Sequence, residues 1–384
     1  MSKGKEQKPV VLQILPEMNQ GGVERGTIEV AAALNKEGIT NFVASSGGRQ
    51  VYNLERMKVP HFTLPLKSKN PFKMYTNSVR LAEIIRKYGI NIVHARSRAP
   101  AWSAYWACKK TGAIYLTTFH GTYGLGPKGI KKFYNRVMTY GKLVIAISEH
   151  IKKHIMEHYG VSEDKIRLIP RGVDVDKFDK SKVTSERIIN MVKEYNLPDD
   201  KPIILLIGRL TRWKGQHLLI EAASKLKDKN FHCVLLGDDQ GRVKYTEELK
   251  QAIKSHDLGA NFSFVKHSDD VPTMMQIASI ILSTSTEPEA FGRIAIEGQA
   301  MGKIVVASNV GGSLENIIDG KSGKLFENND VQSLADTLDW ALHLPEREKE
   351  EISKSAIKNV HDNFTTQLLC DRTIAVYKEL MNIK

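Results

Sequence analysis

Short apolar runs recur along the chain, separated by stretches whose apolar residues have helical spacing. The runs of the first half are 10–15, 42–44, 90–93, 114–116, 143–147 and 166–169. Strands with little polar alternation, separated by helices, are typical of a parallel sheet buried on both faces. The first half therefore predicts one doubly wound α/β domain.

This alternation pauses over 171–201 and then starts again, before a tail at 331–384 with helical patterns only. The runs of the second half are 203–207, 233–236, 262–265, 280–282 and 304–307. At 384 residues the chain is also longer than one compact core usually supports. The pattern therefore predicts a second α/β domain.

We place these two domains at 1–175 and 201–360, with a linker at 176–200 that acts as a hinge. A helix in 361–384 has no strand partner in the sequence, so we expect it to pack back across the domain junction. Closure of the two domains would then enclose a cleft and exclude water from it.

The composition is that of an ordinary globular protein, with 41% hydrophobic and 26% charged residues. Cys108, Cys233 and Cys370 are far apart and form no Cys-x-x-Cys or Cys/His cluster, which argues against a disulfide framework or a structural zinc. The first nine residues are polar and charged, and no apolar run approaches the ~20 residues of a membrane span. We expect a cytoplasmic protein.

Charge divides the chain unequally. Residues 1–150 carry 23 Lys and Arg against 8 Asp and Glu, whereas 201–384 carry 23 against 25. A one-sided basic field indicates that an anionic partner approaches the first half. Nucleic acid, acidic lipid headgroups and a phosphorylated acceptor all have the required charge.

Two strand-to-helix junctions are built alike. In the first half, Gly21 and Gly22 follow a strand and precede an alanine-rich helix; in the second half, Gly292 lies in the segment 285–293, near the start of a helix predicted at 290–299. Glycine lets backbone N–H groups turn toward a ligand at a helix N-terminus, where phosphate is favoured.

A third loop, 208–215, follows the apolar strand 203–207 directly and carries Arg209 and Lys214. Loops at the carboxyl ends of parallel strands are where such sheets bind ligands. A guanidinium and an ammonium on one such loop can hold a diphosphate, the guanidinium through two parallel hydrogen bonds.

Glu289 and Glu297 stand eight residues apart around the predicted helix. Eight helical residues rise about 12 Å, more than the roughly 5–9.5 Å between the carboxylates of a hydrolytic pair. Two ends of one elongated ligand are the better interpretation.

Together these motifs resemble the retaining glycosyltransferases of the GT-B architecture, which has two Rossmann-like domains, and specifically glycosyltransferase family 4. The resemblance covers nearly the whole chain, and its most specific element is Glu289 and Glu297 within the Pro-Glu-Ala-Phe-Gly context of 288–292. The motifs that support it are Gly208-Arg209 with Lys214-Gly215, Gly21-Gly22, 169–174 with Phe178, Gly311-Gly312 with Glu315, and Gly320 with Gly323.

The resemblance implies roles for these residues. Arg209 and Lys214 would bind the diphosphate of a nucleotide-sugar donor, Glu297 the nucleotide ribose, and Glu289 hydroxyls of the transferred sugar. His120, just past a strand, matches a family histidine near that sugar. Backbone donors would face the phosphates and the reacting centre, at Gly21, Gly22, Phe291, Gly292, Arg293 and Ile294.

The sequence also departs from the family. Arg171 stands where the family often has Asn, and Ala290 where it often has Gly, so either difference could narrow the choice of substrate. Asp174-Val175-Asp176 mimics a metal-binding Asp-x-Asp, but the family uses Asp for structure in this segment. We therefore expect no metal site and no cofactor, with a UDP- or GDP-sugar as substrate.

The expected partners are a nucleotide-sugar, a glycan or lipid-linked acceptor such as lipopolysaccharide core, and an anionic membrane surface, but no nucleic acid. The segment 128–136 mixes cations with aromatic residues as interfacial helices do, and Lys67, Lys69 and Lys73 add positive charge. These features predict a peripheral enzyme at the inner face of the cell membrane. A sugar-nucleotide epimerase or another enzyme of this fold remains an alternative; a nucleic-acid binder would explain the charge alone.

Overall fold

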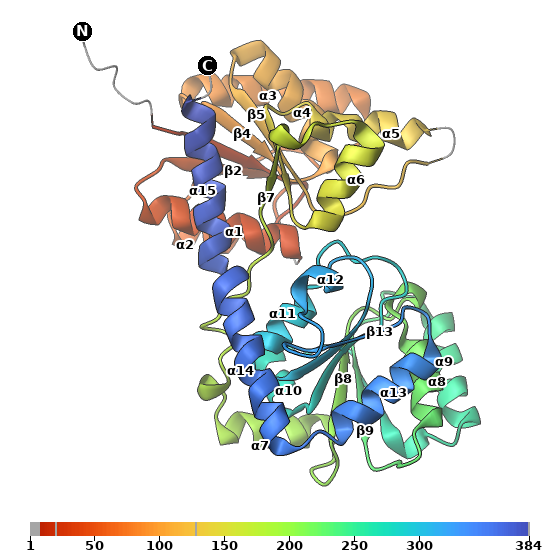
Figure 1. Ribbon diagram of the computed structural model, residues 1–384. Helices are drawn as coiled ribbons and strands as arrows, with labels where there is room; N and C mark the ends of the chain where they lie inside the picture. The colour runs from red at the N-terminus through yellow and green to blue at the C-terminus, as the bar shows by residue number, and fades with distance from the viewer. Residues whose placement is uncertain (1–7, 20, 127–128, 383–384) are drawn as a thin grey trace. The chain divides into compact units, whose positions relative to one another are not determined.

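The computed structural model describes residues 8–19, 21–126 and 129–382, which form two compact units. Unit 1 consists of 1–171 and 366–384, and unit 2 of 172–365. Each unit contains one parallel sheet flanked by helices, so the predicted fold class of two Rossmann-like domains is confirmed (Figure 1).

The sheet of unit 1 has seven strands in the order β3-β2-β1-β4-β5-β6-β7. The strands are β1 (Val11–Ile14), β2 (Asn41–Ser45), β3 (His61–Thr63), β4 (Ile92–Ala95), β5 (Ile114–Phe119), β6 (Leu143–Ala146) and β7 (Ile166–Leu168). The helices are α1 (Gly22–Lys36), α2 (Val51–Arg56), α3 (Pro71–Lys87), α4 (Arg98–Thr111), α5 (Ile130–Asn135), α6 (Glu149–Tyr159) and α15 (Thr366–Asn382). The order reverses between β1 and β4, which is the topological switch point of this sheet.

The last helix completes unit 1. Helix α15 packs against α1 (Figure 1). Its residues Tyr377, Ile374 and Leu380 are buried in one apolar cluster with Leu34 of α1 and residues of the central strands. The chain therefore leaves unit 1 after Arg171 and returns to it at Thr366.

The sheet of unit 2 has six strands in the order β10-β9-β8-β11-β12-β13, and its switch point lies between β8 and β11. The strands are β8 (Ile203–Ile207), β9 (His232–Leu236), β10 (Phe262–Val265), β11 (Ile280–Ser283), β12 (Ile304–Ser308) and β13 (Lys324–Phe326). The helices are α7 (Ser185–Tyr195), α8 (Gln216–Lys225), α9 (Val243–Ser255), α10 (Val271–Ile277), α11 (Arg293–Ala300), α12 (Ser313–Asn316), α13 (Val331–Leu342) and α14 (Glu346–Asn363).

Four boundaries differ from those predicted. The first domain is expected to run to residue 175, but the chain leaves unit 1 after Arg171. The stretch 176–200 is no simple linker, because it belongs to unit 2 and contains α7, which packs on α10. Residues 361–365 belong to unit 2 as well. The helix expected from residue 290 begins only at Arg293, because Gly292 adopts a left-handed conformation with φ of 80°.

The three cysteines are free and buried. No helix in the described part of the chain is long and apolar enough to cross a membrane.

Candidate active site

The strongest candidate site lies at the carboxyl ends of β8 and β11, on the two sides of the switch point of unit 2. The loop after β8 is fixed against the end of β11 at Gly215, whose left-handed backbone (φ 69°) approaches Thr284 so closely that a Cβ there would lie 2.0 Å from the Thr284 carbonyl oxygen. Only glycine fits this contact.

Hydrogen bonds strengthen this contact between the two loops. The Thr286 amide donates to the Trp213 carbonyl at 2.8 Å, and the Thr284 hydroxyl donates to the Lys214 carbonyl at 2.8 Å. The backbone that carries Lys214 is therefore held in place before any ligand arrives.

Lys214 and Glu289 meet in this site. The Lys214 Nζ lies 2.6 Å from Glu289 Oε1, and the two side chains are only 14% and 16% exposed. The same oxygen accepts hydrogen bonds from the hydroxyls of Ser285 and, at 3.5 Å, Ser283. An ammonium has three protons to donate, so one bond to Glu289 orients Lys214 and leaves donors for phosphate oxygens.

Arg209 lies on the same loop, with an exposed side chain. Its backbone carbonyl accepts a hydrogen bond from Gln216 Nε2 at 3.0 Å, which anchors the loop while leaving the guanidinium unconstrained by that contact. The loop thus presents two cations of different geometry to a ligand.

The loop after β12 packs against the backbone that precedes the N-terminus of α11. A Cβ at Gly312 would lie 2.3 Å from the Phe291 carbonyl oxygen, and the Gly312 amide donates to the Glu289 carbonyl at 2.9 Å. Asn316 Nδ2 donates to the carbonyls of Phe291 and, at 3.4 Å, Gly292. The backbone around Glu289 and Gly292 is thereby rigid, and the first amides of α11 at Arg293 and Ile294 have no intrahelical acceptor.

Glu297 lies on α11 and is 8% exposed. It pairs with Arg293, one helical turn earlier, at 2.8 Å between Arg293 Nη2 and Glu297 Oε1. The pair holds the Glu297 carboxylate beside the first turn of α11, next to Gly292.

Gly21, Gly22 and His120 lie in the other unit, at the carboxyl ends of β1 and β5. Gly21 is the N-cap residue of α1, which has no side-chain cap and carries Glu24 in its first turn. Neither ring nitrogen of His120 has a hydrogen-bond partner among the described residues, although both are shielded from solvent. The predicted residues therefore form two groups, one in each unit.

Burial, and then the charges of Arg171, Arg96 and His94, lower the pKa of His120 well below its ordinary value. The imidazole is therefore neutral near pH 7, so it can accept a proton or a hydrogen bond at one nitrogen and donate at the other.

The sequence analysis missed Arg96 and His94 and treated Arg171 only as a departure. Arg96 follows β4 at the switch point of unit 1, and its guanidinium bonds to Gln13 of β1. A Cβ at Gly26 would lie 2.7 Å from Arg171 Nη1 and 3.4 Å from Arg96 Nη2, so both guanidiniums share one face of α1. Arg96 and Arg171 follow the carboxyl ends of β4 and β7, and this position in the sequence could have marked them as candidate site residues.

The Asp174-Val175-Asp176 segment is used for local structure. The carboxylate of Asp174 accepts hydrogen bonds from the amides of Asp176 and Lys177, both at 3.1 Å, and Asp176 pairs with Lys182 at 2.8 Å.

Two features of this geometry, cationic loops at the switch point of unit 2 and a second parallel-sheet unit with its own helix-terminal glycines, define the GT-B class of glycosyltransferase. Residues 188–359 match the family described as glycosyl transferases group 1, and 20–177 match glycosyltransferase family 4. A crystal structure of a glycosyltransferase from Rickettsia africae ESF-5 is 41% identical, with 98% of this chain and 100% of that chain covered and a TM-score of 0.91. The chain therefore belongs to the group 1 glycosyl transferases, with a domain of family 4, and is a transferase.

Two further relatives are more distant. The uncharacterized glycosyltransferase MJ1607 of Methanocaldococcus jannaschii is 29% identical over 246 residues, a match that covers 62% of this chain and 60% of that protein. Anabaena Alr3699/HepE in complex with UDP and glucose is 21% identical, with 97% and 100% of the two chains covered and a TM-score of 0.82, and shows the fold.

Proposed function

We propose that this protein is a metal-independent, retaining glycosyltransferase that moves a sugar from a nucleoside diphosphate to a lipid-linked or envelope glycan acceptor, such as lipopolysaccharide core. The observation that carries the proposal is the 2.6 Å pair between Lys214, on the loop that also bears Arg209, and Glu289, on the loop after β11. The binding of UDP and glucose by HepE supports a UDP-sugar as the donor.

In the reaction, the bond between the anomeric carbon and the diphosphate oxygen breaks, and negative charge develops on the departing phosphate. Arg209, Lys214 and the free amides of α11 would stabilise this charge as a preorganised electrostatic site, which is usually the largest catalytic contribution. Glu289 would hold the sugar hydroxyls while orienting Lys214. The acceptor oxygen would bond to the anomeric carbon on the face that the diphosphate leaves, and its proton would pass to the departing phosphate.

The acceptor side is supported by charge and by exposed aromatic side chains. Unit 1 carries 31 Lys and Arg against 13 Asp and Glu, whereas unit 2 carries 25 against 30. Phe72 on α3 and Phe133 on α5 are 75% and 68% exposed, and both neighbour exposed lysines, Lys73 and Lys132. Lys128, part of the predicted interfacial segment, lies outside the described residues. We propose that unit 1 docks on the anionic inner face of the cell membrane through these aromatic side chains and the lysines beside them.

The donor and acceptor can be identified by mass analysis of products formed from UDP-, GDP- and ADP-sugars with a membrane lipid extract. We expect glycosylated lipid with a UDP-sugar. Absence of product with every donor, although the protein binds UDP, would contradict the proposed acceptor class.

The catalytic roles are tested by Arg209→Gln and Lys214→Gln. Each change should lower the rate of nucleoside diphosphate release by about 10²–10³. Arg212→Gln is the matched control, because Arg212 lies on the same loop but is 70% exposed and pairs with Glu248. Wild-type rates in both variants, or an equal loss in the control, would refute the assignment.

A further inference from the structure

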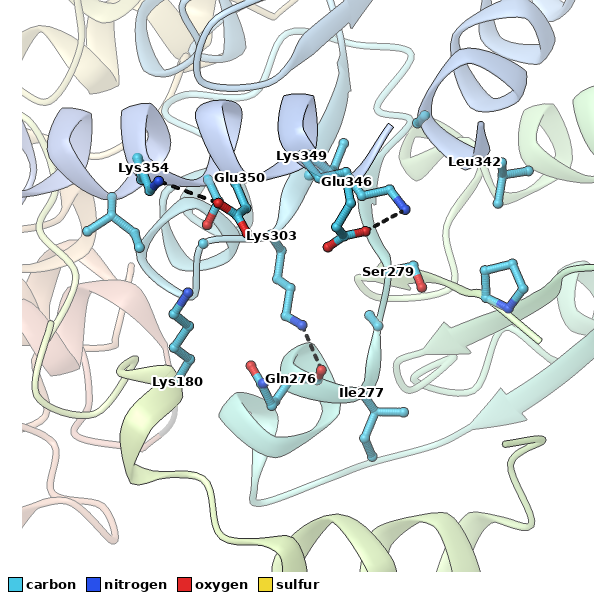
Figure 2. Close-up of a pocket in the computed structure, with 17 residues that line it drawn as sticks. Lys180, Gln276, Ile277, Ser279, Lys303, Leu342, Glu346, Lys349, Glu350 and Lys354 are labelled. Atoms are coloured by element: carbon cyan, nitrogen blue, oxygen red, sulfur yellow. Dashed lines mark hydrogen bonds and ion pairs between the residues drawn. The ribbon is translucent and has the colours of Figure 1, made fainter. Parts of the chain in front are cut away.

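Unit 2 contains a cavity that lies away from the residues of the transferase site. It lies at the amino ends of β8, β11 and β12, the edge of the sheet opposite to the loops that carry Lys214 and Glu289, and its volume is about 620 Å³ (Figure 2). Its walls come from the starts of these strands, the end of α10 and the first turns of α14. Ligand pockets of proteins usually measure about 300–1,000 Å³.

The cavity has an excess of positive charge. Four lysines line it, Lys180, Lys303, Lys349 and Lys354, against the two carboxylates of Glu346 and Glu350. Each carboxylate lies 3.5 Å from a lysine of α14, in the pairs Glu346–Lys349 and Glu350–Lys354 (Figure 2). Among the described residues, Lys180 and Lys303 have no such partner.

Lys303 is the central group of this cavity. It precedes β12 and reaches to the C-terminal end of α10, where its Nζ donates to the Gln276 carbonyl at 2.7 Å (Figure 2). This bond caps the helix, which is a structural role. It uses one of three ammonium protons, however, and it does not neutralise the charge.

Gln276 supplies a second, independent signal. Its side-chain Oε1 is buried and has no hydrogen-bond partner in the described part of the chain, and Gln276 itself lines the cavity. A buried acceptor without a donor costs about 1–3 kcal/mol, and a hydroxyl of a ligand in the cavity would recover this cost by donating to Gln276 Oε1.

We propose that this cavity binds a small phosphorylated polyol, of the sugar phosphate class, with the phosphate between Lys180 and Lys303 and a hydroxyl donating to Gln276 Oε1. The phosphate would relieve the repulsion between the two lysines through charge-assisted hydrogen bonds. A free anion would leave Gln276 unsatisfied, and a neutral sugar would leave the lysines uncompensated.

The electrostatics of Lys303 agree with this geometry. Burial, and then the charge of Lys180, lower the pKa of Lys303 to about 8. The other charged groups that face it are Glu346, Lys349, Glu350 and Lys354 of α14. A bound phosphate dianion would favour the charged form of Lys303 and so raise this pKa.

The cavity is separate from the donor loops. Helix α11 connects the two, because one end lies at the donor site and the other at the cavity. Helix α11 begins beside Gly292 in the donor site and ends at Ala300, and Gly302 and Lys303 of the cavity follow directly. Binding at the two ends of α11 should therefore be compatible, and a nucleotide should not displace the sugar phosphate.

The test is calorimetric titration of the full chain, saturated with UDP, with glucose 6-phosphate, inorganic phosphate and glucose. We expect saturable binding of glucose 6-phosphate, weaker binding of phosphate and none of glucose. Lys303→Gln and Lys180→Gln should each weaken glucose 6-phosphate binding about tenfold or more. Lys358→Gln is the matched control, since Lys358 lies further along α14 and pairs with Asp362.

Four results would overturn the proposal: no binding of glucose 6-phosphate, equal binding of phosphate or of glucose, unchanged affinity in both lysine variants, or competition by UDP. UDP binding by each variant shows that unit 2 is folded. Lys180 is exposed, so Lys180→Gln remains informative if Lys303→Gln is unstable. Failure of the transferase assignment would instead appear as loss of UDP binding or turnover.

Discussion

At the scale of single residues, the Lys214–Glu289 pair combines a structural and a chemical role. The two side chains are mostly buried, so removing one partner leaves the other charge desolvated, and this costs more than removing both. The hydroxyl of Ser285 partly compensates the carboxylate.

A double-mutant cycle measures this coupling. Lys214→Met and Glu289→Gln should each lower the free energy of unfolding, and the double variant should be less destabilised than their sum by about 1–3 kcal/mol. Urea denaturation of the four proteins gives the value. An additive result would mean that the pair contributes no mutual stabilisation.

The buried ammonium of Lys303 lowers the free energy of unfolding, and this cost depends on pH. Its pKa is about 8 in the folded protein against an ordinary value of 10.5, so between these values the unfolded chain binds more protons than the folded one. Stability from this group therefore rises as the pH increases from 8 to 10.5, and the full cost of the buried charge is present below pH 8.

Comparison with Lys303→Met isolates this contribution. We expect the stability of wild type relative to the variant to increase by about 1–3 kcal/mol between pH 7 and pH 10, measured by urea denaturation. The loss of the Gln276 cap affects all pH values equally. A difference that stays constant over this range would contradict the lowered pKa.

At the scale of elements, the loops of unit 2 depend on close backbone contacts that only glycine allows. Gly312 packs against the backbone of Phe291 too closely for a Cβ. Gly292 adopts the left-handed conformation that lets α11 begin at Arg293. The positions of Glu289 and Glu297 thus follow from the packing of three loops at the ends of β8, β11 and β12.

Gly312→Ala should displace the Phe291 backbone and weaken UDP binding about tenfold or more, as measured by calorimetry. Gly320→Ala is the control, because Gly320 has a φ of 72° with no atom within 4 Å of the new Cβ. The control should lose about 1–2 kcal/mol of stability and keep its UDP affinity. Normal UDP binding by Gly312→Ala would show that this contact does not position the donor site.

At the scale of the whole molecule, charge is divided between the units more sharply than along the sequence. Unit 1 has a formal charge of +18 and unit 2 of −5, because 151–171, with five Lys and Arg against three Asp and Glu, belong to the basic unit and 172–200, with five against seven, to the acidic one. An anionic surface therefore attracts one unit and repels the other.

Sedimentation with vesicles tests this consequence. We expect binding to vesicles rich in phosphatidylglycerol at low salt and no binding to phosphatidylcholine vesicles. Binding should be lost at 0.5 M salt, because the Debye length is then below ~5 Å and screens the attraction. Phe72→Ser with Phe133→Ser should weaken membrane binding and leave UDP binding unchanged. Equal binding to neutral and anionic vesicles would contradict the electrostatic docking surface.

Much of this architecture could be predicted from the sequence, because a strand buried on both faces is an apolar run that can be recognised locally. The predicted runs of both halves coincide with strands of the two sheets, whereas β3 (His61–Thr63) and β13 (Lys324–Phe326) were missed. Neither strand forms an apolar run, because β3 contains one apolar residue, Phe62, and β13 only two, Leu325 and Phe326.

The sequence by itself determined the fold class, the family motifs and the glycine-led loops, since each depends on residues that are close in the chain. Only the tertiary structure decided which distant groups meet: Lys214 with Glu289, Arg96 with Arg171 beside Gly26, and Lys180 with Lys303 around one cavity. The physical reason is that burial and Coulomb energies depend on distance in space, which the order of the residues does not contain.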